Sequence, residues 1–459
     1  MNKKTKLIIV LLLAILAMTS LALFLFLAPD TTPDATETQG NVSVPLTSSQ
    51  QYTQAVNNIK SNFTVTVTCE ATLPVTQTCI STVYVSDYGT ENMQIVSDSS
   101  IKIGLQNIDY QSAFQRNHSY LDVADSAFGG EMSAEDFYLQ FSPVPIFSTK
   151  LYSVISSQNS SDGLTIYFSQ PSQGEPWAMP SNAILESAQG TAVLKNGELV
   201  QSTYAITYKL GDSTHEKQYR ADFSTNTQGV MMPDIGMYTM VSAPQAALQL
   251  EYAYGYIMAT TDISSYVNDQ TICETFGDEL YKTTALTTSG TIENYSATLK
   301  INIQQKNKSR GDDITQKHQA VTYENGTYTM IIDNGDPITK TTITPGYMQS
   351  YCKDYLVGTI LMPSEISDIS IEESENQYVY RFISTSDALA ERIRQRASQD
   401  LYGDAVQLEN LYTTDSLGGY LTIDKHSGLP VASGINYTGA HEFDGNPYKL
   451  IFKTDQTYN

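Results

Sequence analysis

Apolar and polar residues alternate along much of the chain after residue 60. The segments 63–69, 82–86 and 165–169 place an apolar or β-branched residue at every second position. Clusters of Asn, Gly, Asp and Ser separate these runs. A period of two is typical of a strand with one buried face, and the clusters are typical of turns. The pattern therefore predicts a chain built mainly from antiparallel β-sheet.

Helical periodicity is confined to a few segments. It predicts helices over 50–60, over 245–257 and over 387–402. In the third segment Ser386 is the expected N-cap and Gly403 the expected stop. Its apolar stripe consists of Leu389, Ile393, Ala397 and Leu401. Further helical stretches are expected over 133–141, 146–156 and 344–361.

The first 28 residues have a different pattern. An apolar run of 22 residues, 7–28, follows three lysines, Lys3, Lys4 and Lys6. As a helix it would be about 33 Å long, enough to cross a hydrocarbon core of about 30 Å. We expect an uncleaved anchor with a cytoplasmic N-terminus and an extracytoplasmic bulk. The alternative is a cleaved signal, with Ser20 and Ala22 as the small residues before the cut and a secreted product.

The chain contains an internal duplication. Residues 117–125 align with 325–333, sharing the Asn, the hydroxyl residue, the Tyr and the Asp. Further downstream, His215-Glu216 aligns with His441-Glu442. These matches keep their order over more than a hundred residues of each half, so we interpret the halves as two copies of one unit. Each unit is expected to turn at Asn117-His118 or Asn325-Gly326 and to end in a closing hairpin.

These observations define five segments. They are an anchor or signal (1–28), a Thr/Pro/Ser-rich disordered stalk (29–50), a first curved-sheet domain (51–226), a linker with a helix (227–267) and a second curved-sheet domain (268–459). The linker also holds four methionines within ten residues. It is interpreted as a helix packed on the second domain, or as an apolar lid. The expected fold class is α+β, with two tandem antiparallel half-barrels and packed helices.

The order of elements, together with the hairpins at Asn117-His-Ser-Tyr120 and Asn325-Gly-Thr-Tyr328, resembles the half-barrel lipoprotein-carrier superfamily of LolA-like and LppX-like proteins. The resemblance covers roughly residues 50–226 and 268–459. It implies a curved sheet wrapped around helices, an apolar cavity that can hold lipid, and no catalysis. This chain differs from that pattern in having two copies and no Cys beside its apolar run.

Composition excludes several function classes. The formal net charge is -23, which argues against nucleic acid as a partner. The sequence has no HExxH, no nucleotide-binding glycine loop and no G-x-S-x-G elbow. We therefore predict no cofactor, no metal site and no catalytic residues. The expected partners are the membrane, through the N-terminal helix, and a lipid or an envelope polymer.

Two sets of residues remain as candidate sites. The four cysteines can form two disulfides in an exported protein, with Cys69–Cys79 and Cys273–Cys352 the favoured pairs, or they can remain free thiols. Arg392, Arg394 and Arg396 cluster on one predicted helix. They are interpreted either as a solvated face paired with Glu391 and Asp400 or as a contact for an anionic polymer or headgroup.

Three functions are consistent with these features. The leading hypothesis is a membrane-anchored, extracytoplasmic, non-enzymatic protein that binds an apolar ligand or an envelope partner. The first alternative is a structural or adhesive surface protein. The second is a polysaccharide-active enzyme that uses acidic residues. The inner face of each sheet would distinguish the three: the binding protein predicts a hollow apolar face, the structural protein a filled face, and the enzyme a polar face with clustered acids.

Overall fold

The computed structural model describes residues 46–458 with gaps. The gaps are 60–61, 72–76, 89, 104–105, 135, 138–152, 162, 170–183, 211–212, 225–229, 260–262, 278, 294–295, 308–312, 325–326, 334, 342–360, 403–410 and 426–428. The predicted anchor and nearly all of the predicted stalk lie outside the described residues. No helix in the described ranges has the length and apolar character needed to span a membrane.

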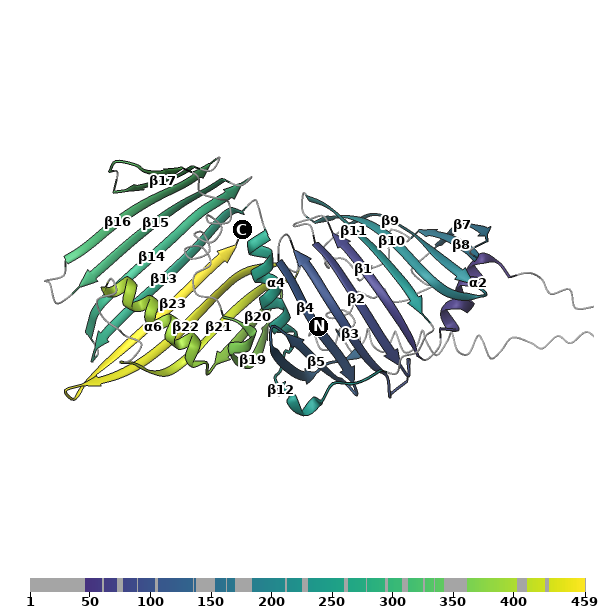
Figure 1. The fold of residues 1–459 in the computed structure, drawn as a ribbon, viewed down its shortest axis with the longest axis horizontal. Helices are drawn as coiled ribbons and strands as arrows, with labels where there is room; N and C mark the ends of the chain where they lie inside the picture. Colours follow the sequence, from purple (N-terminus) through teal and green to yellow (C-terminus); the bar gives the residue numbers. More distant parts are fainter. Residues whose placement is uncertain are drawn as a thin grey trace, which may run out of the picture. The chain divides into compact units, whose positions relative to one another are not determined.

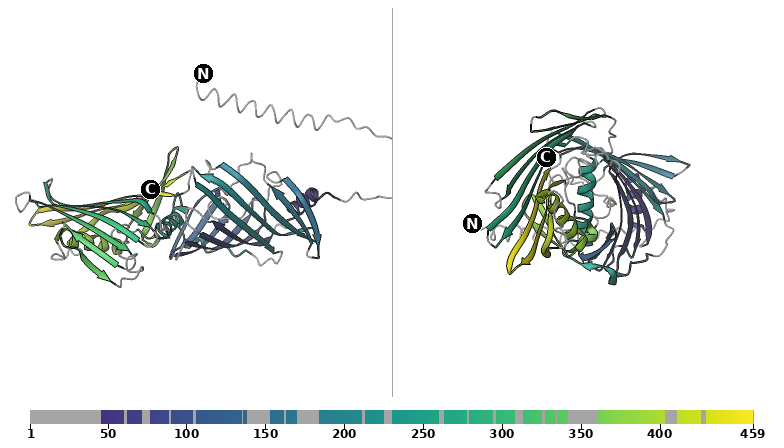
Figure 2. Two further views of the ribbon diagram at one scale, coloured as in Figure 1. Left: turned by 90° about the horizontal axis from the view of Figure 1, so that it is seen from above. Right: turned by 60° about the vertical axis from the view of Figure 1, so that its left-hand side comes forward.

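The alternating segments form two large curved sheets (Figures 1 and 2). The first sheet contains β1 (Phe63–Ala71), β2 (Gln77–Ser86), β3 (Gln94–Ile103), β4 (Gln106–Gln115), β5 (His118–Val123), β6 (Ser126–Glu131), β7 (Ser153–Ser160), β8 (Gly163–Ser169), β9 (Ile184–Lys195), β10 (Glu198–Leu210), β11 (Ser213–Ser224) and β12 (Thr239–Met240). The period-two pattern thus predicted the dominant structure correctly.

The second sheet contains β13 (Ile263–Phe276), β14 (Glu279–Glu293), β15 (Ser296–Asn307), β16 (Asp313–Glu324), β17 (Thr327–Ile332), β18 (Ile338–Thr341), β19 (Ile366–Glu373), β20 (Gln377–Ser384), β21 (Thr413–Asp424), β22 (Pro430–Phe443) and β23 (Asn446–Tyr458). The described chain is mostly β-strand, and its few helices are a smaller share than the α+β class implies.

Both sheets follow one topology. The first has the order β12-β6-β5-β4-β3-β2-β1-β11-β10-β9-β8-β7, and the second has the order β18-β17-β16-β15-β14-β13-β23-β22-β21-β20-β19. Apart from β12, each strand of the first sheet has a counterpart at the same place in the second. In both, the first strand pairs antiparallel with the last, β1 with β11 and β13 with β23. A shared strand order is what two copies of one unit would give.

One face of each sheet carries the core. In the first sheet Val65 lies opposite Val83, and Val67 lies between Ser81 and Ala221. These side chains are fully buried, while the alternate residues such as Thr64 and Thr66 are half-buried. We call the buried side the inner face. The inner face of the second sheet is defined in the same way by Ile272, Tyr437, Leu450 and Phe452, which are all fully buried.

Two helices contact the first sheet. Helix α2 (Ser48–Asn57) begins with a capping box at Thr47 and packs Tyr52 and Ala55 against apolar side chains of β8 and β9. Helix α4 (Gln245–Ala259) contacts β3, β4 and β5. A Cβ on Gly255 of α4 would lie 3.4 Å from Ile108. The prediction that this helix packs on the second domain is therefore incomplete, because its contacts are chiefly with the first sheet.

A short segment before α4 joins the two sheets. Strand β12 pairs parallel with β6, and the glycines of β6 allow this approach, since a Cβ on Gly130 would lie 2.5 Å from the carbonyl of Val241. Ser242 then donates from its amide and hydroxyl to the carbonyl of Ile369 on β19, at 3.3 and 2.9 Å. Residues 47–459 form one compact unit. The domain boundaries at 226–227 and 267–268 stay predictions.

Helix α6 (Asp387–Tyr402) lies where the sequence predicts it. The Ser386 hydroxyl accepts from the amide of Leu389 at 3.2 Å, which confirms the predicted cap. All four residues of the predicted stripe are buried, at 0–3% exposure. The helix contacts β13 and β14 and begins beside the short 3-10 helix η4 (Pro363–Glu365), to which it is tied by Arg392.

Two-residue turns with positive φ at both positions connect several strands. The turn predicted at Asn117-His118 is formed by Arg116 and Asn117, with φ of 50° and 60°, and His118 already belongs to β5. The equivalent turn at Asn325-Gly326 lies outside the described residues. Asn196-Gly197 and Asp444-Gly445 form two more such turns, where residues that tolerate positive φ match the twist of the hairpin.

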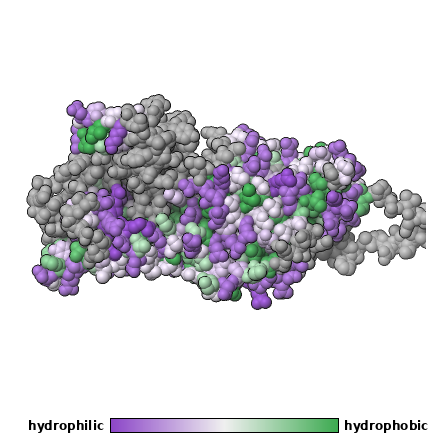
Figure 3. Space-filling view, viewed as in Figure 1, coloured by the Kyte–Doolittle hydropathy of each residue, from purple (hydrophilic) through white to green (hydrophobic). Residues whose placement is uncertain are grey.

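The outer surface is mixed in polarity. Figure 3 shows apolar side chains in separate spots among polar ones over the coloured part of one face. Exposed apolar residues include Ile80, Ile155, Ile184, Met231, Met237 and Phe443. Three of the four clustered linker methionines are more than half exposed, so the described part of that segment does not form a closed apolar lid.

The inner face of the second sheet should dominate the stability of that half. We expect Phe452→Ala to lower the free energy of unfolding by about 3–5 kcal/mol, because it leaves a cavity beneath a fully buried ring. Phe443→Ala, on the neighbouring strand, removes a ring that is 60% exposed and should change it by less than about 0.5 kcal/mol. Urea unfolding followed by circular dichroism measures both. Equal effects would contradict this assignment of faces.

Candidate functional site

The inner face of the first sheet carries a group of polar and aromatic side chains on β1, β10 and β11. We call Cys69, Tyr208, His215, Lys217 and Tyr219 the inner polar cluster. On β11, His215, Lys217 and Tyr219 are two residues apart and share one face. Tyr208 lies opposite His215, and Cys69 lies opposite Tyr219. Because Ala221 and Val67 continue the same rows, the cluster lies on the core side of the sheet.

The ring of Tyr208 is the centre of this cluster. The His215 imidazole stacks on it with a centroid separation of 5.2 Å and an interplanar angle of 10°. The Lys217 ammonium lies 5.9 Å from the centroid of the same ring. A cation within about 6 Å of an aromatic face is attracted by the ring quadrupole, more strongly where water is excluded. Tyr208 thus holds two nitrogen-bearing side chains side by side.

Burial controls the ionisation of these groups. Desolvation lowers the pKa of Lys217, although the neighbouring Cys69 thiol opposes part of that effect. Desolvation also raises the pKa of Cys69 and raises the pKa of Tyr208 to about 12. The cluster therefore provides an inward-facing cation whose charge is poorly solvated, beside a thiol and a phenol that stay protonated at neutral pH.

A row of buried serines crosses the same face toward β5. Ser81 and Ser99 share a hydrogen bond of 2.7 Å between their hydroxyls, and Ser97 and Ser99 share one of 2.9 Å. Ser112 and Ser119 are fully buried, and their hydroxyls have no hydrogen-bond partner. The buried Nδ1 of His215 also lacks one. Each buried polar atom without a partner lowers the stability of the folded protein by about 1–3 kcal/mol, so three such atoms on one face require an explanation.

The structure brings two of the four cysteines together. Cys69 and Cys79 are directly opposite each other on β1 and β2, and both are free thiols. Burial raises the pKa of Cys79 to about 11. Cys273 is also free, and its sulfur lies 3.3 Å from the hydroxyl of Thr283. Cys352 lies outside the described residues. Both predicted disulfides therefore stay predictions, although the register of β1 and β2 is compatible with the first.

The three arginines of α6 have partners within the protein. Arg392 makes two hydrogen bonds of 2.6 and 3.0 Å to the carboxylate of Glu365, and Arg396 donates to Asp400 at 2.8 Å. Arg394 donates to the hydroxyls of Thr414 and Tyr437 at 3.3 and 3.5 Å, and its Nε has no partner. The expected pairing with Asp400 is present, whereas Glu391 accepts from Gln395. An anionic partner at this helix stays a prediction.

A carboxylate occupies the inner face of the second sheet. Glu274 is 5% exposed and accepts short hydrogen bonds from the hydroxyls of Tyr402 and Tyr412. Burial and this carboxylate raise the pKa of Tyr412 well above its usual range. Close by, Asp400 accepts from Gln270 at 2.7 Å, and its carbonyl accepts from Thr284 at 3.1 Å. This network fixes the end of α6 against β13 and β14.

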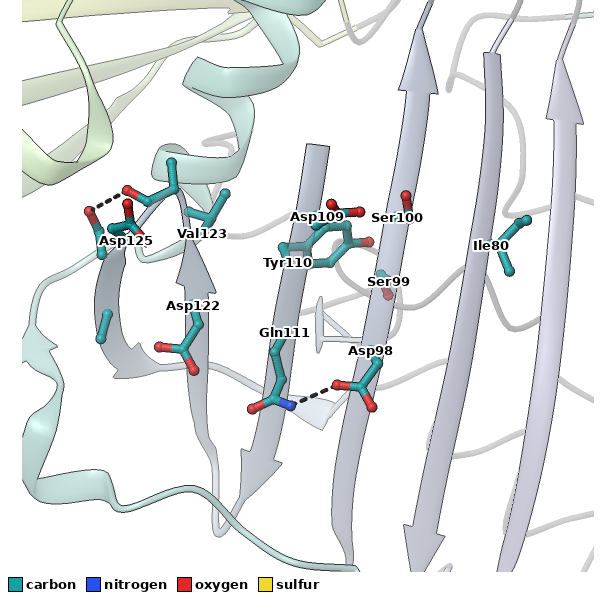
Figure 4. A pocket seen from close by; sticks show the side chains of 13 residues that line it. Ile80, Asp98, Ser99, Ser100, Asp109, Tyr110, Gln111, Asp122, Val123 and Asp125 are labelled. Carbon is teal, nitrogen blue, oxygen red and sulfur yellow. Dashed lines mark hydrogen bonds between the residues drawn. The ribbon is translucent and has the colours of Figure 1, made fainter. Parts of the chain in front are cut away.

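A separate polar groove lies on the outer face of the first sheet. It has a volume of about 930 Å³ and is lined chiefly by strands β3 to β6. Figure 4 shows Asp98, Gln111 and Asp122 side by side on three neighbouring strands, with Gln111 donating to Asp98 at 2.7 Å. Tyr238 donates to Asp122 at 2.6 Å. The groove is open, and the carboxylates of Asp98, Asp109 and Asp122 accept hydrogen bonds within the protein, so it has the character of a solvated acidic surface.

The described histidines show where the sequence alignment of the two halves was wrong. His215 lies on β11, whereas His441 lies on β22, the counterpart of β10. The matched His-Glu pairs are therefore not equivalent in the two sheets. Among the described residues, no group of three or more His, Cys, Asp and Glu side chains is arranged to hold a metal ion.

Comparison with known proteins gives no assignment. No family model and no curated protein matches the chain. Among solved structures, LprF from Mycobacterium bovis is 13% identical, with 40% of this chain and 95% of that chain covered and a TM-score of 0.25. Kievitone hydratase from Nectria haematococca is 9% identical, with 93% of this chain and 97% of that chain covered and a TM-score of 0.15. Likeness at this level supports no conclusion about function.

The facing thiols give a direct test of the β1–β2 register. We expect the thiol oxidant diamide to join Cys69 and Cys79 within one chain, each thiol losing a hydrogen as diamide is reduced to the hydrazine. The rate should rise with pH toward about 11, because a raised pKa leaves little thiolate at neutral pH. Peptide mapping detects the link. Cys273→Ser should not affect it, and a link from Cys69 to Cys273 instead would contradict the register.

The Glu274 network can be tested by a double-mutant cycle. Tyr412→Phe removes one hydroxyl from a buried carboxylate and should lower the free energy of unfolding by about 1–3 kcal/mol. Glu274→Gln should also destabilise, and the double variant should lose less than the sum of the two. Urea unfolding measures all three. Additive losses would show that Glu274 and Tyr412 are not coupled.

Proposed function

We propose that the protein is an extracytoplasmic, non-enzymatic binding protein whose first sheet holds an apolar or amphiphilic ligand on its inner face. The observation that carries this proposal is the chemistry of that face. It combines apolar side chains of β1 to β5 and β11 with a row of buried serines, and three of its buried polar atoms, on Ser112, Ser119 and His215, lack a partner. A ligand with polar groups along an apolar body would satisfy such a surface.

The two helices flank the region in which we propose that the ligand lies. Helix α2 packs against β7 to β10, α4 packs over β3, β4 and β5, and the hydroxyl of Tyr252 on α4 donates to Gln77 of β2 at 2.9 Å. The inner polar cluster belongs to β1, β10 and β11, between these two ends. This arrangement is compatible with the tandem half-barrel organisation predicted from the sequence, which forms part of the proposal.

Location is a further part of the proposal. The lysines and apolar run of residues 3–28 would anchor the chain in a membrane, with the two sheets outside. An amphiphilic ligand is a natural cargo for a protein held beside a bilayer. The acidic composition would keep such a domain soluble at that surface without attracting polyanions.

The second sheet favours a different role. Its inner face is occupied by α6 and by the hydrogen bonds of Glu274 and Asp400. A filled inner face is what the structural or adhesive alternative predicts. We therefore propose that ligand binding belongs to the first sheet, while the second provides a rigid partner surface.

Ligand extraction tests this proposal. We expect the full chain, purified from its membrane, to release a stoichiometric amphiphile into organic solvent, as detected by mass spectrometry. Ala221→Leu adds bulk to the fully buried inner face and should reduce the bound amount, because packed sites tolerate extra methylenes poorly. Ala205→Leu on the opposite face of β10 is the matched control. No extracted amphiphile from the wild-type chain, or equal amounts from both variants, would reject inner-face binding.

A further inference from the structure

The closing hairpins of the two sheets have the same pairing register. The last pair before the turn is Leu210 with Ser213 in the first sheet and Phe443 with Asn446 in the second. Two residues further from each turn, Tyr208 pairs with His215 and His441 pairs with Tyr448. The same two positions thus hold one Tyr and one His in both sheets, with their strands exchanged.

The adjacent positions differ in charge. Two residues beyond His215 and Tyr448, on the same face, β11 has Lys217 and its counterpart β23 has the fully buried Leu450. On the neighbouring first strand, Ala71 lies opposite Lys217, whereas Glu274 lies opposite Leu450. The equivalent pairs on the two inner faces therefore differ: the first sheet has a lysine on its β11 side, and the second has a carboxylate on its β13 side.

The carboxylate of the second sheet is satisfied by the protein itself. Glu274 accepts from Tyr402, at the end of α6, and from Tyr412. Both hydroxyls come from residues packed onto that face, so the site is closed by internal hydrogen bonds. Nothing in this arrangement calls for a ligand.

The equivalent place in the first sheet lacks such closure at one atom. The His215 side chain is 5% exposed and stacks on Tyr208, yet its Nδ1 has no hydrogen-bond partner. Two residues away on the same face, the Lys217 ammonium lies 5.9 Å from the Tyr208 centroid. An imidazole nitrogen and an ammonium are both donors to an oxyanion, and charge-assisted hydrogen bonds strengthen where water is excluded.

We propose that Lys217 and His215, positioned by Tyr208, bind the anionic head group of an amphiphile on the inner face of the first sheet. The corresponding pair of the second sheet, Leu450 with Glu274, does not bind it. This proposal rests on the proposed function and names its ligand class. The head group is a carboxylate or a phosphate, because either oxyanion fits the two donors.

The test is native mass spectrometry of the full chain released from a nonionic detergent. Oleate, dioleoylphosphatidylglycerol and neutral dioleoylglycerol are added in turn. Lys217→Met keeps the length of the side chain and removes its charge, and we expect it to weaken binding of an anionic ligand about ten- to a hundredfold. Binding of dioleoylglycerol should change less than about threefold. A response with oleate alone identifies a carboxylate site, and one with the phospholipid alone identifies a phosphate site.

Matched variants separate charge from folding. Lys209→Met removes an exposed lysine of the same hairpin, which pairs with Glu186 at 2.6 Å, and should leave binding unchanged. Lys217→Arg keeps the charge and should retain anion binding within a few fold. His215→Phe keeps the ring stacking and should weaken binding of the anionic ligands only. Glu274→Gln should lower stability without altering binding.

Two results would overturn the head-group site. One is Lys217→Met binding the anionic ligands as tightly as the wild-type chain does. The other is an equal loss of neutral and anionic ligands, which would make Lys217 a packing residue. Failure of the proposed function has a different signature, since the wild-type chain would then bind none of the three amphiphiles.

Discussion

Both sheets depend on pairing between strands that are far apart in the chain. β1 pairs with β11 and β13 pairs with β23, so each half brings its first strand beside its last one. The other strands pair antiparallel with a strand next to them in sequence, on one side or the other, except β12, which pairs parallel with β6. This pairing creates the continuous inner face on which the core is built. It also places Cys69 and Ala71 beside Tyr219 and Lys217, residues that are about 150 positions away.

The two inner faces solve the same burial problem in different ways. A face with a buried ionisable group must supply partners for it or leave it poorly solvated. In the second sheet the tyrosine hydroxyls and the end of α6 surround Glu274. In the first sheet the Lys217 ammonium lies 5.9 Å from the centroid of the Tyr208 ring, and burial lowers the pKa of that lysine. The tightly bonded face suits a structural role, and the less closed one suits binding.

Local signals in the sequence predicted local structure well. The period-two runs became strands, and the stripe, cap and bounds of α6 were predicted because they depend on residues within one helix. The two halves could be matched because similar short segments recur in the same order, and the two sheets share one strand order. The predicted share of helix was too high. Asn196-Gly197 and Asp444-Gly445 were turn signals that could have fixed the β9–β10 hairpin of the first sheet and the closing hairpin of the second. Partners such as Ala71 for Lys217 could not be predicted, because the long-range register decides them and no short motif encodes it.

The exchange of Tyr and His between the hairpins explains why matching letters misled the alignment of the repeats. A directly opposed pair in an antiparallel ladder is related by a local twofold axis, so exchanging its two residues keeps them paired. The contact is not identical, since the rings are 5.2 Å apart and nearly parallel in the first sheet and 6.4 Å apart and tilted by 39° in the second. Physical equivalence therefore lies in the pair, Tyr208 with His215 and His441 with Tyr448, and not in the position of either histidine. The charged residues next to the Tyr–His pair have opposite signs in the two sheets: Lys217 in the first and Glu274 in the second. A difference in function between the two halves is then to be sought at those neighbours, because the surrounding register is the same.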